Sequence, residues 1–316
     1  MQTTSPAPSS APIDAVLKQI YSEAQALFGK GKVASYIPAL AQVQPRQFGM
    51  VVALVDGATH SVGDALTPFS LQSITKLFAF VLALKTVGDA LWERVGREPS
   101  GAAFNSMVQL ETERGIPRNP FINAGALVIT DILTTRYAHL DIALLGALRR
   151  LTDTPSLSWN AVIARSERET AHRNMAMAYF MKSYGNFVNP PDLVLDNYCR
   201  QCAIEMNCAQ LAQATMFLAN GGIDIDRDAK PGEVFLSADA AQRVNALMLT
   251  CGAYDAAGDF AYRIGLPVKT GVGGGIVAIV PGKGTVAVWA PELDAKGNSV
   301  LGTFALERLV QLTGWH

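Results

Sequence analysis

The strand-like segments of this 316-residue chain lie near its two ends, and a long stretch of helical pattern separates them. Residues 48–54 form a Val-rich apolar run, and Asp56-Gly57 separates it from a second short run that ends at Val62, as in a β-hairpin. Further Val- and Ile-rich runs follow Gly265, at 266–269, 275–280 and 285–290. Strands at both ends must bury their apolar faces, so this order predicts one antiparallel sheet built from the two ends.

The rest of the chain shows helical spacing of its apolar residues. Helices are predicted at 13–29, near 73–88, 120–135, 140–150, 170–184, 192–206, 208–219 and 237–251, and at 301–312. The predicted fold class is therefore α/β (α+β), an antiparallel sheet flanked by terminal helices with an inserted all-helical lobe. We expect residues 13–66 and 256–316 to form the sheet-and-helix lobe and residues 67–255 the helical lobe. Residues 1–12, rich in Ser, Thr, Pro and Ala, are expected to be a disordered tail.

The balance of charges argues against nucleic acid or membrane partners. The 26 Lys and Arg residues are offset by 27 Asp and Glu residues, which leaves no basic patch for a phosphate backbone or an anionic membrane. No run of 18 apolar residues suggests a membrane span, and the first residues lack the basic and apolar regions of a signal peptide. A cytoplasmic location is the expectation.

Cysteine and histidine give no sign of a metal site. Cys199 and Cys202 form a C-x-x-C pair without the second pair or nearby His that a zinc site needs, so we interpret the cysteines as buried, reduced thiols. The four His residues show no spacing such as H-E-x-x-H. Neither a metal nor another cofactor is expected, and any base would be a lysine.

Ser73 and Lys76 form an S-x-x-K motif at the predicted start of the helix that opens the insert. Residues three apart on a helix share one face, so the amine can reach the hydroxyl. Serine becomes nucleophilic only when a neighbour accepts its proton, and burial beside Leu77 and Phe78 favours the neutral amine that can do so. By itself the motif is common, and an ordinary helix start is the simpler interpretation.

A second motif, Lys269-Thr270-Gly271, follows on the first strand after the insert. S-x-x-K followed by K-T-G on a strand is typical of serine acyl enzymes with a penicillin-recognising fold. Tyr184-Gly185-Asn186 is either the third element of that pattern or an ordinary turn. The Gly-rich run 271–275 fits no phosphate-loop pattern, and it indicates a place where substrate or backbone approaches closely and a backbone N–H serves as an oxyanion donor.

With these motifs in place, the chain resembles the serine-dependent glutaminase family from about Ile13 to Gly314. The resemblance rests on several blocks, namely GKVASYIP at 31–38, residues 69–76, 98–101 and 104–106, GIPRNPFINAGA at 115–126 and GLPVKTGVGGG at 265–275. It implies a β-lactamase/transpeptidase-like fold and the hydrolysis of L-glutamine to L-glutamate and ammonia. A homodimer or homotetramer is also implied.

The resemblance further implies a set of site residues. Ser73 would be the nucleophile, Lys76 its general base and Tyr254 a proton relay. The family's substrate contacts carry over to Tyr36, Ser73, Asn123, Glu167, Asn174, Tyr198, Tyr254 and, through its backbone, Val272. A carboxylate such as Glu167 suits the α-ammonium of glutamine, while Asn and Tyr donors suit its α-carboxylate. The amides of Ser73 and Val272 would form the oxyanion hole.

Two other functions stay open at this point. A penicillin-hydrolysing or peptidoglycan-trimming enzyme shares both motifs but works outside the cytoplasm and needs export. A ligand-binding or scaffold protein could keep the fold without the chemistry, in which case Ser73→Ala would leave its function intact.

Overall fold

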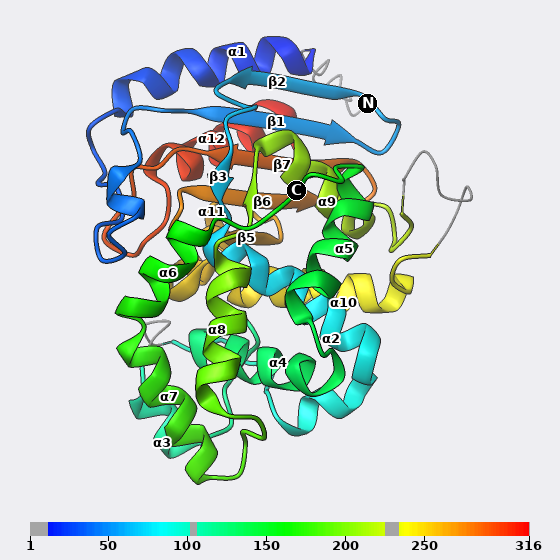
Figure 1. Ribbon diagram of the computed structural model, residues 1–316. Coiled ribbons are helices and arrows are strands. Elements are labelled where there is room, and N and C mark those ends of the chain that lie inside the picture. Colours follow the sequence, from blue (N-terminus) through cyan, green and yellow to red (C-terminus); the bar gives the residue numbers. More distant parts are fainter. Residues whose placement is uncertain (1–11, 102–105, 225–233, 316) are drawn as a thin grey trace.

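The computed structural model describes residues 12–101, 106–224 and 234–315, and the predicted tail therefore falls outside the described residues except for Pro12. Five strands form one antiparallel sheet in the order β2-β1-β7-β6-β5 (Figure 1). They are β1 Gly49–Leu54, β2 Thr59–Gly63, β5 Val268–Thr270, β6 Gly275–Val280 and β7 Gly284–Trp289. Met50 of β1 pairs with Val288 of β7, so the prediction that both ends of the chain share one sheet is confirmed.

The two faces of the sheet belong to two hydrophobic cores. Adjacent residues of a strand point to opposite faces. Met50 and Val52 accordingly pack in the core with α1 (Ile13–Ala24), α11 (Ala257–Arg263) and α12 (Val300–Thr313), whereas Val51 lies in the core of the helical insert. Because both faces are covered, β6 and β7 are buried at every position, and their sequences are apolar apart from Thr285, whose hydroxyl donates to the carbonyl of Ala212.

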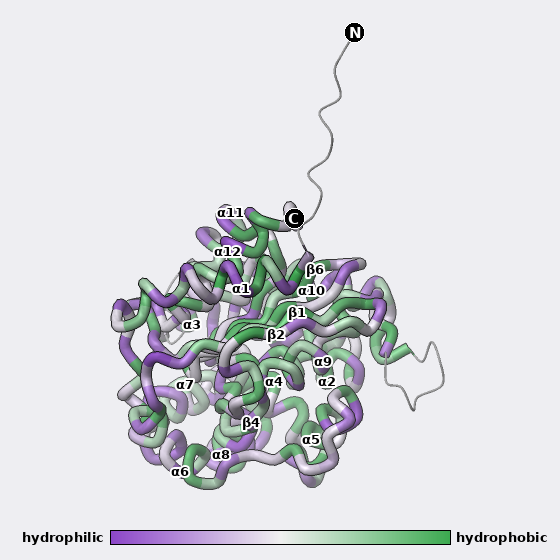
Figure 2. The backbone as a smooth tube through the Cα atoms, turned by 90° about the horizontal axis from the view of Figure 1, so that it is seen from above, coloured by the Kyte–Doolittle hydropathy of each residue, from purple (hydrophilic) through white to green (hydrophobic). Residues whose placement is uncertain are grey.

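Helix α9 (Cys208–Ala219) joins the sheet to the rest of the insert by packing on β1, β6 and β7. Both α9 and β1 are strongly hydrophobic along the backbone trace in Figure 2. The other helices are α2 Thr75–Val87, α3 Val108–Thr112, α4 Asn123–Arg136, α5 Leu140–Thr152, α6 Ala161–Thr170, α7 His172–Ser183, α8 Pro191–Cys202 and α10 Ala238–Cys251. The proposed lobe boundaries at 66/67 and 255/256 stay a prediction.

Three predicted elements differ from the structure. The helix expected at 192–206 ends at Cys202, and Glu205–Met206 form a short strand, β4, that pairs with β3 (Phe69–Ser70). Our prediction that the insert holds no strand was therefore wrong, because two-residue strands are too short to show a period. The predicted helix at 170–184 begins only at His172, after a break at Ala171. The first helix ends at Ala24 and continues as a 3-10 turn, Gln25–Leu27.

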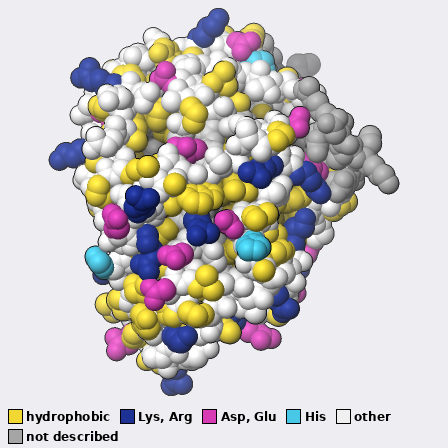
Figure 3. All heavy atoms as spheres, viewed as in Figure 1, with side chains coloured by type: hydrophobic (Ala, Val, Ile, Leu, Met, Phe, Trp, Pro, Cys, Tyr) yellow, Lys and Arg dark blue, Asp and Glu magenta, His cyan; other side chains and the backbone are white. Residues whose placement is uncertain are grey.

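The described surface carries charges of both signs, interspersed over the face seen in Figure 3. None of the helices in the described ranges combines the length and the hydropathy that a membrane span requires.

Candidate active site

A cavity of about 220 Å³ opens where the turn before α2, the junction of α6 with α7, and the loop after β5 come together. Its walls include most of the residues that the sequence singled out, namely Tyr36, Ser73, Asn123, Glu167, Asn174, Tyr198 and Val272. The two remaining predicted residues, Lys76 and Tyr254, contact this wall, because Lys76 bonds to Asn123 and Tyr254 to Ser73. The structure thus brings all the predicted site residues together.

Ser73 lies in a 3-10 turn, Gln72–Ile74, that runs directly into α2. Gln72, the residue before it, has a φ of 50°, in the left-handed region that costs energy for any residue other than glycine. Ser73 itself is 8% exposed, and its exposed part faces the cavity. The turn therefore presents the hydroxyl at the floor of the cavity while its neighbours are buried.

The Gly-rich loop after β5 packs on the backbone of this turn. A Cβ atom on Gly273 would lie 2.1 Å from the carbonyl oxygen of Ser70, and one on Gly271 would lie 2.4 Å from that of Leu71. Trp289 fixes the loop by donating its Nε1–H to the carbonyl of Gly273, at 2.9 Å. The predicted close approach is confirmed, and it places Val272 in the cavity wall with Ser73.

Lys76 is 2% exposed, and its amine is hydrogen-bonded to neutral groups. Its Nζ donates to Asn123 Oδ1 at 2.6 Å and to the carbonyl of Phe121 at 3.2 Å. Burial lowers the pKa of Lys76 to about 8, although Cys202 and Glu167 act in the opposite direction. The amine can therefore exist in its neutral form close to neutral pH.

Tyr254 also has a left-handed backbone, with a φ of 56°. Its hydroxyl hydrogen-bonds with the side chain of Ser73 and donates to the carbonyl of Thr270, at 3.4 Å. Burial raises the pKa of Tyr254 to about 12, so the phenol stays protonated at neutral pH. The Nζ of Lys269, from the K-T-G motif, lies 4.9 Å from the centre of the Tyr254 ring and donates to the carbonyls of Gly252 and Thr270.

Glu167 carries the buried negative charge of the cavity wall. It is 7% exposed, and its Oε2 has no hydrogen-bond partner among the described residues. Burial raises the pKa of Glu167 to about 7, while Cys202, Lys76 and Gln72 act in the opposite direction. A buried carboxylate oxygen without a partner is costly, so the site favours a cationic group from a ligand at this position.

Asn123 and Asn174 form a hydrogen-bonded pair in the cavity wall. Asn123 accepts a hydrogen bond from the Lys76 amine on its Oδ1 and donates one from its Nδ2 to Asn174 Oδ1, at 3.0 Å. The bond from Asn123 does not use the Nδ2 donors of Asn174, which lines the cavity together with Tyr198 and the largely exposed Tyr36. The opening thus has several hydrogen-bond donors for an anionic or carbonyl group.

The Tyr184-Gly185-Asn186 segment and the cysteines do not line the cavity. Tyr184-Gly185-Asn186 does not reach the cavity, because Asn186 donates its Nδ2 to the carbonyls of Arg94 and Gly115, and the turn interpretation is correct. All four cysteines are free and buried, as predicted. In the described part of the chain, no group of three His, Cys, Asp or Glu side chains is placed to hold a metal ion.

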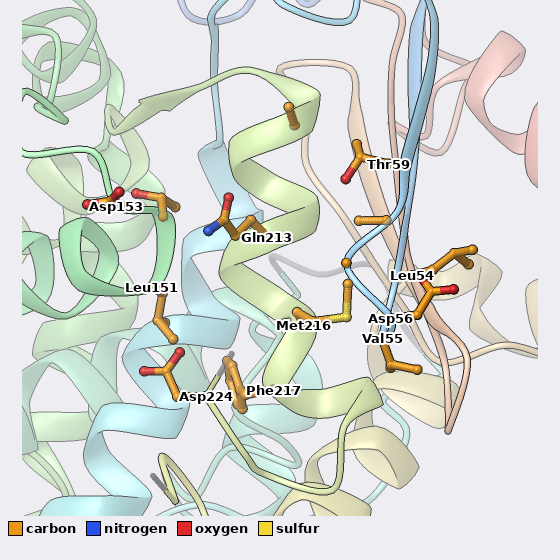
Figure 4. A pocket seen from close by; sticks show the side chains of 14 residues that line it. Leu54, Val55, Asp56, Thr59, Leu151, Asp153, Gln213, Met216, Phe217 and Asp224 are labelled. Atoms are coloured by element: carbon orange, nitrogen blue, oxygen red, sulfur yellow. The ribbon is translucent and has the colours of Figure 1, made fainter. Parts of the chain in front are cut away.

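A larger hollow, of about 530 Å³, lies between the β1–β2 hairpin, α9 and the end of α5 (Figure 4). Gln213, Met216 and Phe217 of α9 face it, with Asp56 and Asp153 on its two sides. It contains neither a serine nor a lysine among its lining residues, so its size does not make it the reactive site.

Sequence reasoning missed several residues of the cavity wall. Gln72, Thr170 and Arg173 line it without belonging to any predicted set. Each is within three positions of a predicted residue, and this proximity was the only available signal, since no motif marks them.

Comparisons with known proteins give one consistent result. The family model described as Glutaminase matches residues 31–316. A glutaminase of Paraburkholderia phytofirmans is 56% identical over 299 residues, which covers 95% of this chain and 97% of the relative. A glutaminase of Streptomyces coelicolor is 55% identical over 299 residues and covers 95% and 96% of the two chains.

Comparison with solved structures also identifies glutaminases as similar proteins. The Bacillus subtilis glutaminase in covalent complex with 5-oxo-L-norleucine, formed by reaction with 6-diazo-5-oxo-L-norleucine, aligns with a TM-score of 0.86 and 32% identity over 96% of this chain and 99% of that one. The protein named Mglu, in its glutamate form, gives a TM-score of 0.89 and 34% identity over 97% of this chain and 69% of that one. The predicted fold class, with its β-lactamase/transpeptidase-like architecture, is confirmed. This chain belongs to the glutaminase family.

Proposed function

We propose that this chain hydrolyses L-glutamine to L-glutamate and ammonia through an acyl-enzyme on Ser73, with Lys76 as the general base. As a member of the glutaminase family it is a hydrolase that acts on amide bonds. The observation that carries the finer proposal is the position of Ser73 on a strained turn in the cavity floor, one helical turn before an amine with a pKa of about 8.

In the acylation step, neutral Lys76 accepts the hydroxyl proton of Ser73 while Oγ attacks the side-chain carbonyl carbon of glutamine. The carbonyl oxygen becomes an oxyanion, and the backbone N–H groups of Ser73 and Val272 stabilise it. The bond from carbon to the amide nitrogen then breaks. The nitrogen takes the proton that Lys76 had accepted, through Tyr254 or directly, and leaves as ammonia.

Deacylation repeats these roles with water. Lys76 takes a proton from a water molecule as its oxygen attacks the γ-glutamyl ester carbon, and the second oxyanion occupies the same site. The ester bond breaks, Ser73 recovers its proton from Lys76, and glutamate leaves. Tyr254 contacts Ser73 and keeps its own proton at neutral pH, so it suits a relay rather than a base.

The ends of glutamine match the polarity of the cavity. We assign the α-ammonium group to Glu167, whose Oε2 has no partner among the described residues. The α-carboxylate lies at the donors of Asn174, Tyr198 and Tyr36, and Asn123 orients the amide while holding Lys76. Support comes from the relative that reacts covalently with 6-diazo-5-oxo-L-norleucine, an amino acid with a reactive ketone in place of the side-chain amide.

Ammonia release from L-glutamine tests the class of reaction and the nucleophile together. We expect Ser73→Ala to lose at least 10³-fold in kcat/KM, because the acyl-enzyme cannot form. Ser183→Ala, at an exposed position on the end of α7, is the matched control and should keep full activity. Release by Ser73→Ala at the wild-type rate would contradict the mechanism, and turnover of nitrocefin without ammonia release would favour a penicillin hydrolase instead.

We place the chain in the cytoplasm as a homodimer or homotetramer, with no nucleic acid or membrane partner. Sedimentation of the purified protein would check the oligomeric state.

A further inference from the structure

The start of α7 forms one wall of the cavity. Thr170, Ala171, Arg173 and Asn174 all line it, and α7 begins at His172 without a side-chain hydrogen bond to its first N–H groups. Uncapped N–H groups at a helix start favour negative charge. Helices α6 and α7 follow one another at the left of Figure 1, so this start lies at the end of the helix that carries Glu167.

Among the described lining residues, Glu167 and Arg173 are the ones with an acidic or a basic side chain. Glu167 is more than nine-tenths buried, and its Oε2 has no partner in the described part of the chain. Arg173 is exposed and lines the cavity, and among the described residues no carboxylate is paired with its guanidinium, since Asp192 and Asp196 pair with Arg168. One wall therefore has an anion in its depth and a cation at its edge.

We propose that Arg173 is a specificity-determining residue that receives the α-carboxylate of the substrate, together with the Nδ2 of Asn174 and the start of α7. This inference rests on the proposed function. A zwitterionic amino acid places its ammonium and its carboxylate on the same carbon, so one molecule satisfies both charges of the wall. A glutamine residue within a peptide has neither charge and leaves Glu167 buried without a partner.

Arginine at this edge acts in two ways. Its guanidinium presents paired donors that match the two oxygens of a carboxylate. Because it is exposed, it also attracts the anionic end of the substrate during encounter, and salt weakens that attraction. The enzyme would thus select free α-amino acids over α-blocked ones.

The test compares two substrates in wild type, Arg173→Gln and Arg173→Lys. One substrate is L-glutamine, and the other is its α-amide, which has the same shape but no carboxylate charge and yields isoglutamine. The control is Arg165→Gln, which removes the same charge from an exposed position of α6 outside the cavity wall. Circular dichroism verifies that each variant is folded.

We expect Arg173→Gln to raise KM for L-glutamine about tenfold with kcat within about twofold, as loss of one charge-assisted contact to a ligand predicts. For the α-amide, Arg173→Gln and wild type should have the same kcat/KM. Arg173→Lys should recover part of the loss, and added salt should lower kcat/KM for L-glutamine less in Arg173→Gln than in wild type. Arg165→Gln should match wild type.

Two results would overturn the inference. One is an unchanged KM for L-glutamine in Arg173→Gln, and the other is an equal rise for both substrates, which indicates a general disturbance of the wall. Failure of the proposed function would give a different result. In that case Ser73→Ala would release ammonia at the wild-type rate, independently of the results for the Arg173 variants.

Discussion

At the residue scale, the site depends on two ionisable groups whose burial moves their pKa values toward neutrality. Lys76 is surrounded by neutral acceptors, so burial is the main influence on its amine and lowers its pKa to about 8. Burial raises the pKa of Glu167 to about 7 for the opposite reason, because its charged form is the anion. Burial in the same low-dielectric surroundings thus affects both groups, and as pH rises Glu167 loses its proton first and Lys76 second.

These values predict how activity depends on pH. Protonated Lys76 cannot accept a proton, and protonated Glu167 cannot pair with an ammonium group. The active forms are therefore the neutral amine of Lys76 and the carboxylate of Glu167, and both are favoured as pH rises. We expect kcat/KM for L-glutamine to rise through about pH 7 and again through about pH 8. The rise should approach about a hundredfold per pH unit below pH 7, where both groups must lose a proton, and about tenfold per unit between pH 7 and 8, where only Lys76 must. The measurement is a rate profile from pH 6 to 9 at constant ionic strength.

Glu167→Gln supplies the control for that profile. It should raise KM and remove the step near pH 7, while the step near pH 8 from Lys76 remains. A wild-type profile that is flat from pH 6 to 9 would exclude Lys76 as the base.

Some of these residues could be predicted from the sequence, because their chemistry is local. Ser73 and Lys76 are three residues apart, and the K-T-G motif marks a strand, so both could be recognised without coordinates. The left-handed backbone of Gln72 could not, since glutamine gives no sign of it and the surrounding packing imposes it. Arg173 was missed for a similar reason, as an exposed arginine at a helix start usually faces only water.

At the scale of elements, the nucleophile turn and the Gly-rich loop are held together by backbone contact. The ring of Trp289 stacks on Phe69 of β3, with centres 5.4 Å apart, and its Nε1 holds Gly273. The loop after β5, the end of β7 and the segment before Ser73 thus form one unit. The sequence indicated that something approaches the glycines closely, but β3 and β4 were too short to reveal which segment it was.

A single methyl group in this contact should therefore impair the reaction. In Gly273→Ala the new Cβ would lie 2.1 Å from the carbonyl oxygen of Ser70, and neither backbone can yield without moving Ser73 or Val272. We expect kcat/KM to fall by at least tenfold, since small displacements of reacting groups cost that much or more. The measurement is ammonia release together with a thermal melt.

Gly258→Ala is the matched control, because this glycine is in α11 and a Cβ there meets no atom within 4 Å. It should retain activity and gain slightly in stability, as alanine favours a helix. Full activity of Gly273→Ala would contradict the view that this contact positions the oxyanion donor.

At the scale of the molecule, the reactive parts are attached to a sheet that needs both ends of the chain. β1 lies between β2 and β7, and the face that α1 and α12 cover is one continuous core. This much could be predicted from the order of apolar runs. The packing of α9 against three strands could not be predicted, because the same apolar helix surface can pack on either a sheet or another helix.

A weakened core at the C-terminal helix should consequently lower the temperature at which the cavity loses its activity. Leu309 of α12 is fully buried in the core it shares with Met50, Ile276 and Val288, and Ile276 pairs with Thr270 at the end of β5. We expect Leu309→Ala to lower the free energy of unfolding by about 2–5 kcal/mol, the range for a buried leucine that leaves a cavity. Activity at 25 °C should persist, because the fold is kept.

On heating, activity and secondary structure should be lost in one transition, shifted to lower temperature in Leu309→Ala, since Val272 and Tyr254 depend on strands of the same sheet. Gln311→Ala, at an exposed position of the same helix, should melt as wild type does. Activity that disappears well before the circular dichroism signal changes, equally in wild type and Leu309→Ala, would mean that the helical part opens independently of the sheet. The cavity would then depend on the insert alone, and the joining of the two chain ends would contribute nothing to catalysis.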